Sequence, residues 1–366
     1  MAKKILIIMG TRPEAIKLAP LFLALNKEKN VICKICLTSQ HKSMLKNMTN
    51  LFGLKPSYDL NVMRYNQNLT ELIERILKGL RKIKEKFTPD IIIVQGDTTT
   101  AIASSLYASM NKIKLAHIEA GLRSFDKNSP WPEEINRKLI SQLSDLNFCP
   151  TIRDYRNLTR ENISNNFIHG NTIVDSVDFI KKNVIPKKID YLNKKFNIYL
   201  KNDLKIFCTI HRRENFGNNL KAILEAIIQL SNKYNINFLI PVHPNPNVKK
   251  IIYSKLNKHK NITLSKPITY DESIFLIDNS DLIMSDSGGI QEEASILKKK
   301  IIILRNKTER QDVLKDFGIL VGSNKKLIIK HTLNNINNNK KLKRIKSPFG
   351  KIGLSNIIAK TIIKLI

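Results

Sequence analysis

The chain contains little cysteine, little tryptophan and no long apolar run. Four Cys in 366 residues are too few for a disulfide-stapled scaffold. No apolar run approaches the roughly 20 residues that cross a bilayer. The apolar stretch 5–9, behind the charged start of the chain, is too short for a signal peptide. We therefore expect a cytoplasmic protein without a membrane-spanning segment.

One pair of cysteines, Cys33 and Cys36, has the spacing of metal ligands. The pair lies in the apolar run 31–37, which has the composition of a strand. Residues three apart on a strand point to opposite faces, so the two thiols cannot easily share a metal or a disulfide. The second C-x-x-C that a four-cysteine zinc site needs is absent. We expect a buried structural role for both residues and no metal site.

Acidic residues are scarce: 31 Asp and Glu stand against 62 Lys and Arg, a formal charge of +31. Such a charge suggests nucleic-acid binding, but most of the basic residues are Lys spread along the chain. Lys is a hydrated point charge, whereas Arg is a planar bidentate fork, and Arg is found largely in the motifs described below. No aromatic–basic interleaving of the kind that stacks bases is present. We expect no nucleic acid as partner.

Short β-branched runs alternate with longer stretches of helical period, and this alternation occurs twice. Nearly continuous apolar runs are typical of parallel strands buried on both faces. The expected strands are 5–9, 31–37, 91–95, 115–118, 146–149, 205–210, 237–242, 282–285 and 301–304. The expected helices include 15–26, 70–87, 99–110, 220–234 and 291–297. The pattern predicts an α/β protein of two Rossmann-like, doubly wound domains.

The domain boundary is expected near Gly170–Asp175. The first domain would span 1–170 and the second 171–349. A closing helix over 350–366 would cross back to the first domain. Polar clusters follow nearly every expected strand, at the sheet edge where open α/β folds bind ligands. The clusters begin at Gly10, Gly96, Glu119, His211, His243 and Asp286.

The segment Asp286-Ser287-Gly288-Gly289 is the strongest single signal. A strand ends, two glycines allow close approach to the backbone, and a helix begins. The free N–H groups and the dipole of a helix start bind anions. Glu293, about one turn into the helix, is placed to accept from ribose hydroxyls. The motif G-x-G-x-x-G is absent, so NAD has little support and no cofactor is expected.

Other charged residues at the expected strand ends suggest a reaction. Arg12 and Lys17 lie near the start of the first helix, where both can face a phosphate. Asp97, Glu119 and Glu133 are carboxylates in or near strand-edge loops. Crowded carboxylates push their pKa values apart, so that one site provides both a base and an acid. His211 and His243 also follow strands. We expect His211 to lie beside phosphate. For His243, a structural role and a role in the site are equally supported.

Taken in order, these motifs resemble the non-hydrolysing UDP-N-acetylglucosamine 2-epimerases of bacteria. The resemblance covers about the first 310 residues. The matching segments begin at Gly10 (GTRPEAIK), Gln40 (QH), Gly96 (GDTTT), His117 (HIEAGLR), Ser129 (SPWPEEINR), Gly170 (GNTIVD), His211 (HRRENF) and Ser285 (SDSGGIQEEA). Any one segment is weak evidence, whereas the collinear set is specific.

The resemblance implies two domains of the GT-B kind facing a cleft, commonly as a homodimer, with no metal and no NAD. The implied reaction interconverts UDP-GlcNAc and UDP-ManNAc: UDP is eliminated to give 2-acetamidoglucal and is then added back with C2 inverted. It would supply ManNAc for cell-surface polysaccharide. The residue that removes the C2 proton stays open among the carboxylates.

The resemblance also implies roles residue by residue. Catalysis falls on Asp97, Glu119, Glu133 and His211. UDP binding falls on Arg12, Lys17, Ser287, Gly288, Gly289, Glu293 and Arg310. A second, regulatory substrate site falls on Gln40, His41, Arg213 and His243.

Several alternatives stay open. The chain could act on a modified UDP-sugar, or release free ManNAc as a hydrolysing 2-epimerase does. It could be a glycosyltransferase of the same fold, although three acidic candidates exceed what simple transfer requires. From other classes, it could be a non-catalytic nucleotide-sugar binder or a basic protein that binds polyanions.

Overall fold

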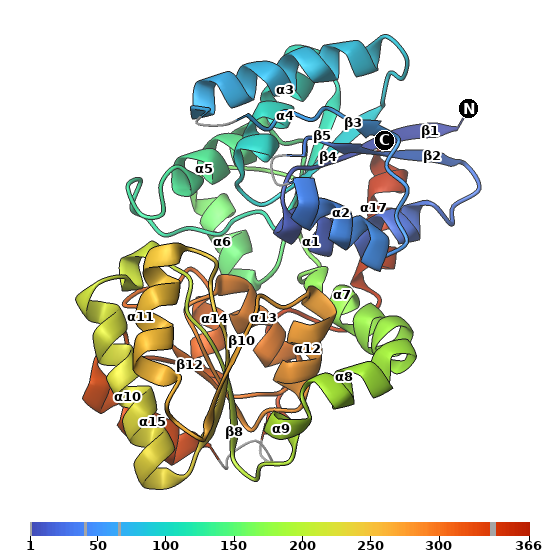
Figure 1. Ribbon diagram of the computed structural model, residues 1–366. Helices are drawn as coiled ribbons and strands as arrows, with labels where there is room; N and C mark the ends of the chain where they lie inside the picture. The colour runs from blue at the N-terminus through green and yellow to red at the C-terminus, as the bar shows by residue number, and fades with distance from the viewer. Residues whose placement is uncertain (1, 40–41, 65–66, 337–341) are drawn as a thin grey trace. The chain divides into compact units, whose positions relative to one another are not determined.

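The computed structural model describes residues 2–39, 42–64, 67–336 and 342–366. The chain divides into two compact units: unit 1 is Met1–Ser176 with Phe349–Ile366, and unit 2 is Val177–Pro348. Each unit is a parallel sheet with helices on both faces (Figure 1). The α/β class and the two Rossmann-like folds expected from the sequence are confirmed.

The sheet of unit 1 has, within the described residues, the strand order β3-β2-β1-β4-β5-β6-β7, and all neighbours are parallel. Its strands are β1 (Lys3–Met9), β2 (Val31–Leu37), β3 (Tyr58–Asp59), β4 (Ile91–Gln95), β5 (Lys114–Ile118), β6 (Leu146–Cys149) and β7 (Asn166–Ile168). Its helices are α1 (Arg12–Leu25), α2 (Lys42–Leu51), α3 (Leu69–Lys84), α4 (Thr99–Met110), α5 (Glu133–Leu143), α6 (Ile152–Arg160) and α17 (Leu354–Leu365). The chain passes from unit 1 to unit 2 within α7 (Ile173–Phe179).

Helix α3 shows how the sequence builds this unit. Its buried residues Leu72, Ile76, Leu80 and Ile83 recur at helical spacing and pack in one core cluster with strands β1, β4 and β5. The side chain of Asn68 accepts from the backbone N–H of Glu71 at 2.8 Å and so caps the helix. The period of apolar residues and a local cap are therefore enough to place the helix on the sheet.

The sheet of unit 2 has the order β10-β9-β8-β11-β12-β13 among the described residues, again all parallel. Its strands are β8 (Lys205–Thr209), β9 (Asn237–Pro241), β10 (Ile262–Ser265), β11 (Leu282–Ser285), β12 (Ile301–Ile303) and β13 (Gly318–Leu320). Its helices are α8 (Ile189–Lys195), α9 (Asn197–Leu200), α10 (Asn218–Tyr234), α11 (Pro246–Leu256), α12 (Tyr270–Asp278), α13 (Gly288–Ile296), α14 (Gln311–Leu314) and α15 (Lys325–Asn335). Three shorter helical segments are η1 (Ile180–Val184), η2 (Ile185–Lys188) and η3 (Arg213–Asn215).

The last helix, α17, belongs to unit 1, where it packs against α1. Asp175 fixes its start, because the carboxylate accepts from the backbone N–H groups of Gly353 and Ser355 at 2.6 Å each. Gly353 has φ +98°, a conformation that favours glycine. A single carboxylate thus joins two segments of unit 1 that lie far apart in the sequence.

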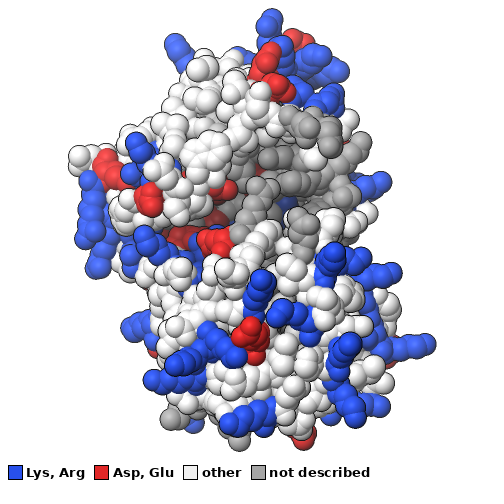
Figure 2. Space-filling view, turned by 60° about the vertical axis from the view of Figure 1, so that its left-hand side comes forward, with Lys and Arg blue, Asp and Glu red and all other residues white. Residues whose placement is uncertain are grey.

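Three further features concern the helices, the cysteines and the surface charge. No described helix combines the length and the apolar character needed to cross a membrane. Cys33, Cys36, Cys149 and Cys208 are all free. Lys and Arg are scattered over the face shown in Figure 2 and do not gather in a single stripe there.

Candidate active site

The loops after β1 and β4 are tied together at the centre of the unit 1 sheet. These strands are neighbours although they are not successive in the chain, and ligands of doubly wound folds bind at such a point. Glu14 is fully buried and accepts from the backbone N–H of Gly10 (2.9 Å) and Thr11 (2.6 Å). It also accepts from the Thr98 hydroxyl at 2.6 Å. The Glu14 carboxylate therefore fixes both loops in place.

A buried ion pair, Lys17 with Glu119, lies beside these loops. Each side chain is 5% exposed. Glu119 also accepts from the side-chain amides of Gln95 and, at 2.9 Å, Asn171. The structure thus places the Lys17 ammonium on a carboxylate of unit 1. Its predicted contact with phosphate stays a prediction.

Asp97 is held by two consecutive residues of α5. Its carboxylate receives the Arg137 guanidinium at 2.6 Å, and its backbone carbonyl accepts from the Asn136 amide at 2.8 Å. The Asp97 side chain is 24% exposed, whereas that of Arg137 is 4% exposed. The carboxylate is thus oriented from the protein side and open to solvent on the other.

The three predicted catalytic carboxylates share one edge of unit 1. Asp97 follows β4, Glu119 follows the neighbouring strand β5, and Glu133 is the first residue of α5, the helix that contacts Asp97. Glu133 is half-buried, and Arg12 is exposed at the start of α1. The arrangement collects acid and base groups at the sheet edge, where proton transfer to a bound substrate can occur.

In unit 2, the corresponding edge carries a histidine–carboxylate pair. The His211 Nδ1 lies 3.1 Å from the Asp286 carboxylate, and 42% of the His211 side chain is exposed. Asp286 is fully buried and also accepts from the backbone N–H of Arg212 (2.9 Å) and the amide of Asn215 (2.9 Å). Burial alone would raise the pKa of Asp286, but these hydrogen bonds and His211 outweigh it and lower the pKa. A carboxylate of this kind fixes the orientation of the imidazole.

The residues after Asp286 form the predicted glycine-rich helix start. Ser287 occupies the N-cap position of α13, and Gly288 and Gly289 are its first two residues. A Cβ on Gly288 would lie 2.8 Å from the Arg310 guanidinium, so only glycine lets that group lie against the backbone. Glu293 is buried further along the same helix. The N–H groups of the helix start and a guanidinium thus lie together, as an anion site requires.

Arg310 is part of a wider group of charges. Its Nε donates to Glu292 at 2.8 Å, and its guanidinium also contacts Glu309. Arg305 contacts Glu309 at 2.9 Å, and Arg212 does so at 3.9 Å. Burial would raise the pKa of Glu309, but the three arginines outweigh it and hold the pKa well below its usual range. With Glu292 and with Glu214, which lies 3.2 Å from Arg305, the three arginines and three glutamates form one charged network beside the helix start.

The residues predicted for a regulatory site are described only in part. Gln40 and His41 lie outside the described residues. Arg213 begins the short helix η3. His243 is half-buried, its Nδ1 accepts from the backbone N–H of Asn245 at 3.2 Å, and burial together with the nearby His211 lowers its pKa. Arg213 and His243 belong to unit 2, on the loops after β8 and β9.

Sequence reasoning missed the residues that hold the candidate carboxylates and the loops beside them. Among them are Glu14, Gln95, Glu134, Asn136, Arg137 and Asn171. A signal existed for Glu14, because Thr11 and Glu14 have the spacing of a capping box. Long-range partners such as Asn171 leave no such local pattern. Within the described residues, no group of three His, Cys, Asp or Glu side chains could hold a metal ion.

Comparison with known proteins gives one consistent result. A family model described as UDP-N-acetylglucosamine 2-epimerase matches residues 23–363. A protein of that name from Campylobacter jejuni is 42% identical over 363 residues, which cover 96% of this chain and 94% of the relative. One from Neisseria meningitidis serogroup A is 41% identical and covers 99% of both chains.

Solved structures agree. The UDP-GlcNAc 2-epimerase from Neisseria meningitidis, bound to UDP-GlcNAc, superposes with a TM-score of 0.93 at 41% identity over 99% of this chain and 100% of that one. The enzyme from Methanocaldococcus jannaschii, in complex with UDP-GlcNAc and UDP, gives 0.85 at 38% identity over 99% of each chain. This chain therefore belongs to the UDP-N-acetylglucosamine 2-epimerase family.

Proposed function

We propose that this protein interconverts UDP-GlcNAc and UDP-ManNAc and so supplies ManNAc for cell-surface polysaccharide. The observation that carries the proposal is the edge of unit 1, where Asp97, Glu119 and Glu133 gather in a chain of this family. Inversion at C2 without a cofactor needs a base on one face of the sugar and an acid to return the proton to the other. A cluster of carboxylates with different partners supplies both.

The proposed reaction balances in two steps. A base takes the proton from C2, the C2–H electrons form the C1–C2 double bond, and the C1–O bond breaks so that UDP leaves with its electron pair. The product is 2-acetamidoglucal. In the second step an acid returns a proton to the opposite face of C2 and the UDP oxygen forms a new bond to C1. No oxidant and no outside nucleophile take part.

The roles divide between the two units. Asp97, Glu119 and Glu133 exchange the proton. The α13 start at Ser287-Gly288-Gly289 and Arg310 bind the diphosphate, and Glu293 accepts from the ribose. His211, oriented by Asp286, assists the departure of UDP. Arg12 and Lys17 are assigned to the phosphate as well, and Arg213 and His243, with Gln40 and His41, to a regulatory substrate site.

The test is a nuclear magnetic resonance assay in heavy water. Wild-type protein with UDP-GlcNAc should form UDP-ManNAc and incorporate deuterium at C2 of both sugars. Binding of UDP without deuterium incorporation would instead identify a non-catalytic nucleotide-sugar binder. Release of free ManNAc would identify a hydrolysing enzyme, and turnover of a modified sugar alone would identify a different substrate.

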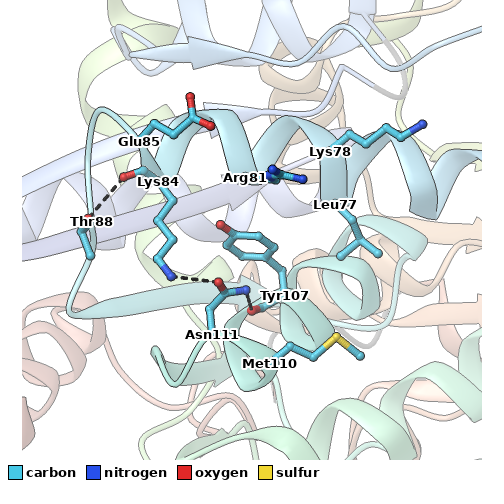
Figure 3. A pocket seen from close by; sticks show the side chains of 9 residues that line it. All are labelled: Leu77, Lys78, Arg81, Lys84, Glu85, Thr88, Tyr107, Met110 and Asn111. Atoms are coloured by element: carbon cyan, nitrogen blue, oxygen red, sulfur yellow. Dashed lines mark hydrogen bonds between the residues drawn. The ribbon is translucent and has the colours of Figure 1, made fainter.

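We also propose that the protein works as a homodimer through the outer face of α3 and α4. A cavity of about 660 Å³ lies on this face and is lined by Leu77, Tyr107 and Met110 among charged side chains (Figure 3). Met110 is 76% exposed, and the buried Tyr107 hydroxyl has no hydrogen-bond partner among the described residues. An apolar centre with an unpaired polar atom is suited to be covered by another chain.

The charges of α3 suggest that the chain covering this face is a second copy of the protein. The helix has Glu71 in its first turn and Arg81, Lys82 and Lys84 in its last. Two copies related by a twofold axis would lie antiparallel, with acidic and basic ends facing each other. Light scattering should give a dimer for the wild type and a monomer for Met110→Asp. The control Ile198→Asp, at a residue 74% exposed in unit 2, should stay dimeric.

The cytoplasm is the compartment we propose. All four cysteines are free, and Cys36, Cys149 and Cys208 are buried. Free thiols persist where the redox environment is reducing.

A further inference from the structure

Asp97 is fixed more thoroughly than an ordinary loop carboxylate. The carbonyl of the preceding Gly96 lies 2.7 Å from the His117 Nε2, its own carbonyl accepts from Asn136, and its carboxylate receives Arg137. The backbone on both sides of Cα and the side chain are therefore all held. Such pre-orientation is what a group that acts on a substrate proton needs.

The contact from His117 does not change with pH in ordinary buffers. His117 is fully buried, and burial lowers its pKa to about 4. The ring is therefore neutral, and because a carbonyl only accepts, the hydrogen must be on Nε2. His117 thus acts as a permanent N–H donor behind the loop that carries Asp97.

The orientation of the Arg137 guanidinium depends on its charge partners. It is nearly fully buried, and a buried cation needs counter-charge. It has two carboxylates: Asp97 at 2.6 Å and Glu134, one helical turn back on α5, at 3.2 Å. Glu134 is itself fully buried. Nη2 donates a hydrogen bond to Asp97, whereas Nη1 forms an ion pair with Glu134 without a hydrogen bond. The two anions hold the guanidinium between them and so orient the Asp97 carboxylate.

Glu134 also holds a loop, using the oxygen that faces Arg137 (Oε2) and its other oxygen (Oε1). It accepts from the backbone N–H of Ser124 at 2.8 Å and of Phe125 at 3.1 Å. These residues belong to the loop between β5 and α5, where Phe125 has φ +61° and is 64% exposed. One carboxylate therefore connects this loop to the guanidinium that orients Asp97.

We propose that Glu134 is a positioning residue that acts on the proton transfer through Arg137 and Asp97. The inference rests on the proposed function. It adds a residue that is not among those assigned to the reaction above. Glu134 is fully buried, whereas its neighbour Glu133 is half-buried. Because Glu134 is enclosed and both its oxygens contact protein donors, it touches no substrate.

The variant Glu134→Gln tests the proposal. Glutamine has the same shape but one acceptor oxygen and no charge. With the amide nitrogen at the Oε2 position, Ser124 and Arg137 both meet an N–H; with it at the Oε1 position, Phe125 does. In both orientations Arg137 loses the negative charge of Glu134. We expect kcat for epimerisation and for deuterium exchange at C2 to fall by roughly 10- to 100-fold. The KM for UDP-GlcNAc and the affinity for UDP should change by less than about threefold, because ground-state binding is untouched.

A matched control is Glu161→Gln. Glu161 also pairs with a buried arginine of unit 1, Arg123, through contacts of 2.6 and 2.8 Å, and makes no contact with Asp97. This variant should lose stability but keep kcat within about twofold of wild type. If Glu134→Gln behaves in the same way, with a lower melting temperature and unchanged kcat, Glu134 is only structural and the proposal is wrong.

A second variant covers the case in which Glu134→Gln does not fold. Arg137→Ala leaves a buried space the size of the lost group, and added guanidinium ion should restore part of kcat, more than it restores for Asp97→Asn. No restoration would contradict the positioning role. An inactive wild type would overturn the proposed function itself, whereas an active wild type with an unaffected Glu134→Gln overturns only this inference.

Discussion

The two units share a strand order at the centre of their sheets but present different side chains at the sheet edge. In both, the first strand lies between the second and the fourth of its unit, so the chain reverses at the centre of the sheet. In unit 1 the loops there present Asp97, Glu119 and Glu133. In unit 2 they present glycine N–H groups, His211 and three arginines. The fold supplies the place, and the loops decide between proton chemistry and anion binding.

The units also differ in how they neutralise buried charge. In unit 1 two of the carboxylates have a cation each: Lys17 contacts Glu119, and Arg137 contacts Asp97. In unit 2 three arginines surround Glu309, and burial of that carboxylate is outweighed so that its pKa is lowered. The charges of unit 1 thus lie in small separate groups, whereas in unit 2 the arginines and the glutamates Glu214, Glu292 and Glu309 form one network beside the helix start. We predict that changes in unit 1 act mainly on turnover and that changes at the helix start of unit 2 act mainly on affinity.

The largest expected effect is on turnover, from a change in unit 1. Asp97→Asn keeps the shape of the side chain but removes its capacity to take a proton. We expect kcat to fall by about 10²- to 10⁴-fold, the usual contribution of a positioned acid or base. UDP affinity, measured by titration calorimetry, should stay near that of wild type because the groups assigned to UDP are unchanged.

A surface carboxylate of the same unit provides the control. Asp90→Asn removes a carboxylate that accepts from the backbone N–H of Lys4 at the opposite end of the sheet, before β4 begins. It should keep its activity. Equal losses of kcat and of UDP affinity in Asp97→Asn would contradict the division of labour between the units.

An intermediate effect is expected on affinity, from a change in unit 2. In Gly288→Ala the new methyl would lie 2.8 Å from Arg310, so the guanidinium must move away from the helix start. We expect UDP to bind about 10- to 100-fold more weakly, as for loss of one charge-assisted contact. Calorimetry with UDP measures this, and single-turnover kinetics should show the chemical step much less affected.

The neighbouring glycine separates crowding from a general effect on the helix. A Cβ on Gly289 has its nearest neighbour, Glu293, at 3.8 Å, which is ordinary contact. Gly289→Ala should therefore weaken UDP binding less than Gly288→Ala. The reverse order would mean that Arg310 is not the group that the methyl displaces.

The sequence predicted the central strands of both sheets but not the outer strands. The central strands were predicted because each is a nearly continuous apolar run, such as 91–94, which is buried in the sheet. The strands β3, β7, β10 and β13 were not predicted, and they are the four outer strands of the two sheets. Edge strands are short and half-exposed, so they lack the apolar run that signals a buried strand.

The candidate site divides in a similar way. Residues in local motifs, such as Asp97 and the pair Gly288-Gly289, could be found because chemistry and spacing coincide within a few positions. The groups that orient them could not. Arg137 lies 40 positions from Asp97, and Asn171 lies 52 from Glu119. Only the folded sheet brings such residues together, and no periodic pattern in the chain records it.

The smallest expected effect concerns stability at mildly acidic pH, and it begins in unit 1. Burial lowers the pKa of His117 from 6.5 to about 4, so between these values the unfolded chain binds a proton that the folded chain refuses. Stability is therefore fully present above pH 6.5 and is lost as pH falls toward 4. In unit 2 the lowered pKa of the half-buried His243 acts in the same direction below pH 6.5, whereas the lowered pKa of Asp286 acts only below its ordinary value of 3.8. Urea unfolding should give a free energy of unfolding lower by on the order of 1 kcal/mol at pH 5.5 than at pH 7.

His117→Gln isolates this contribution, since its amide N–H can replace the donor to Gly96 but does not titrate. The variant should lose less stability than wild type over the same pH interval. Hydrogen exchange should place the wild-type loss at β5, which carries His117, and not at β11, which leads into Asp286. Equal acid sensitivity of wild type and variant would show that His117 does not exclude the proton. The neutral ring that we infer behind Asp97 would then be wrong too, because both statements depend on the same buried imidazole.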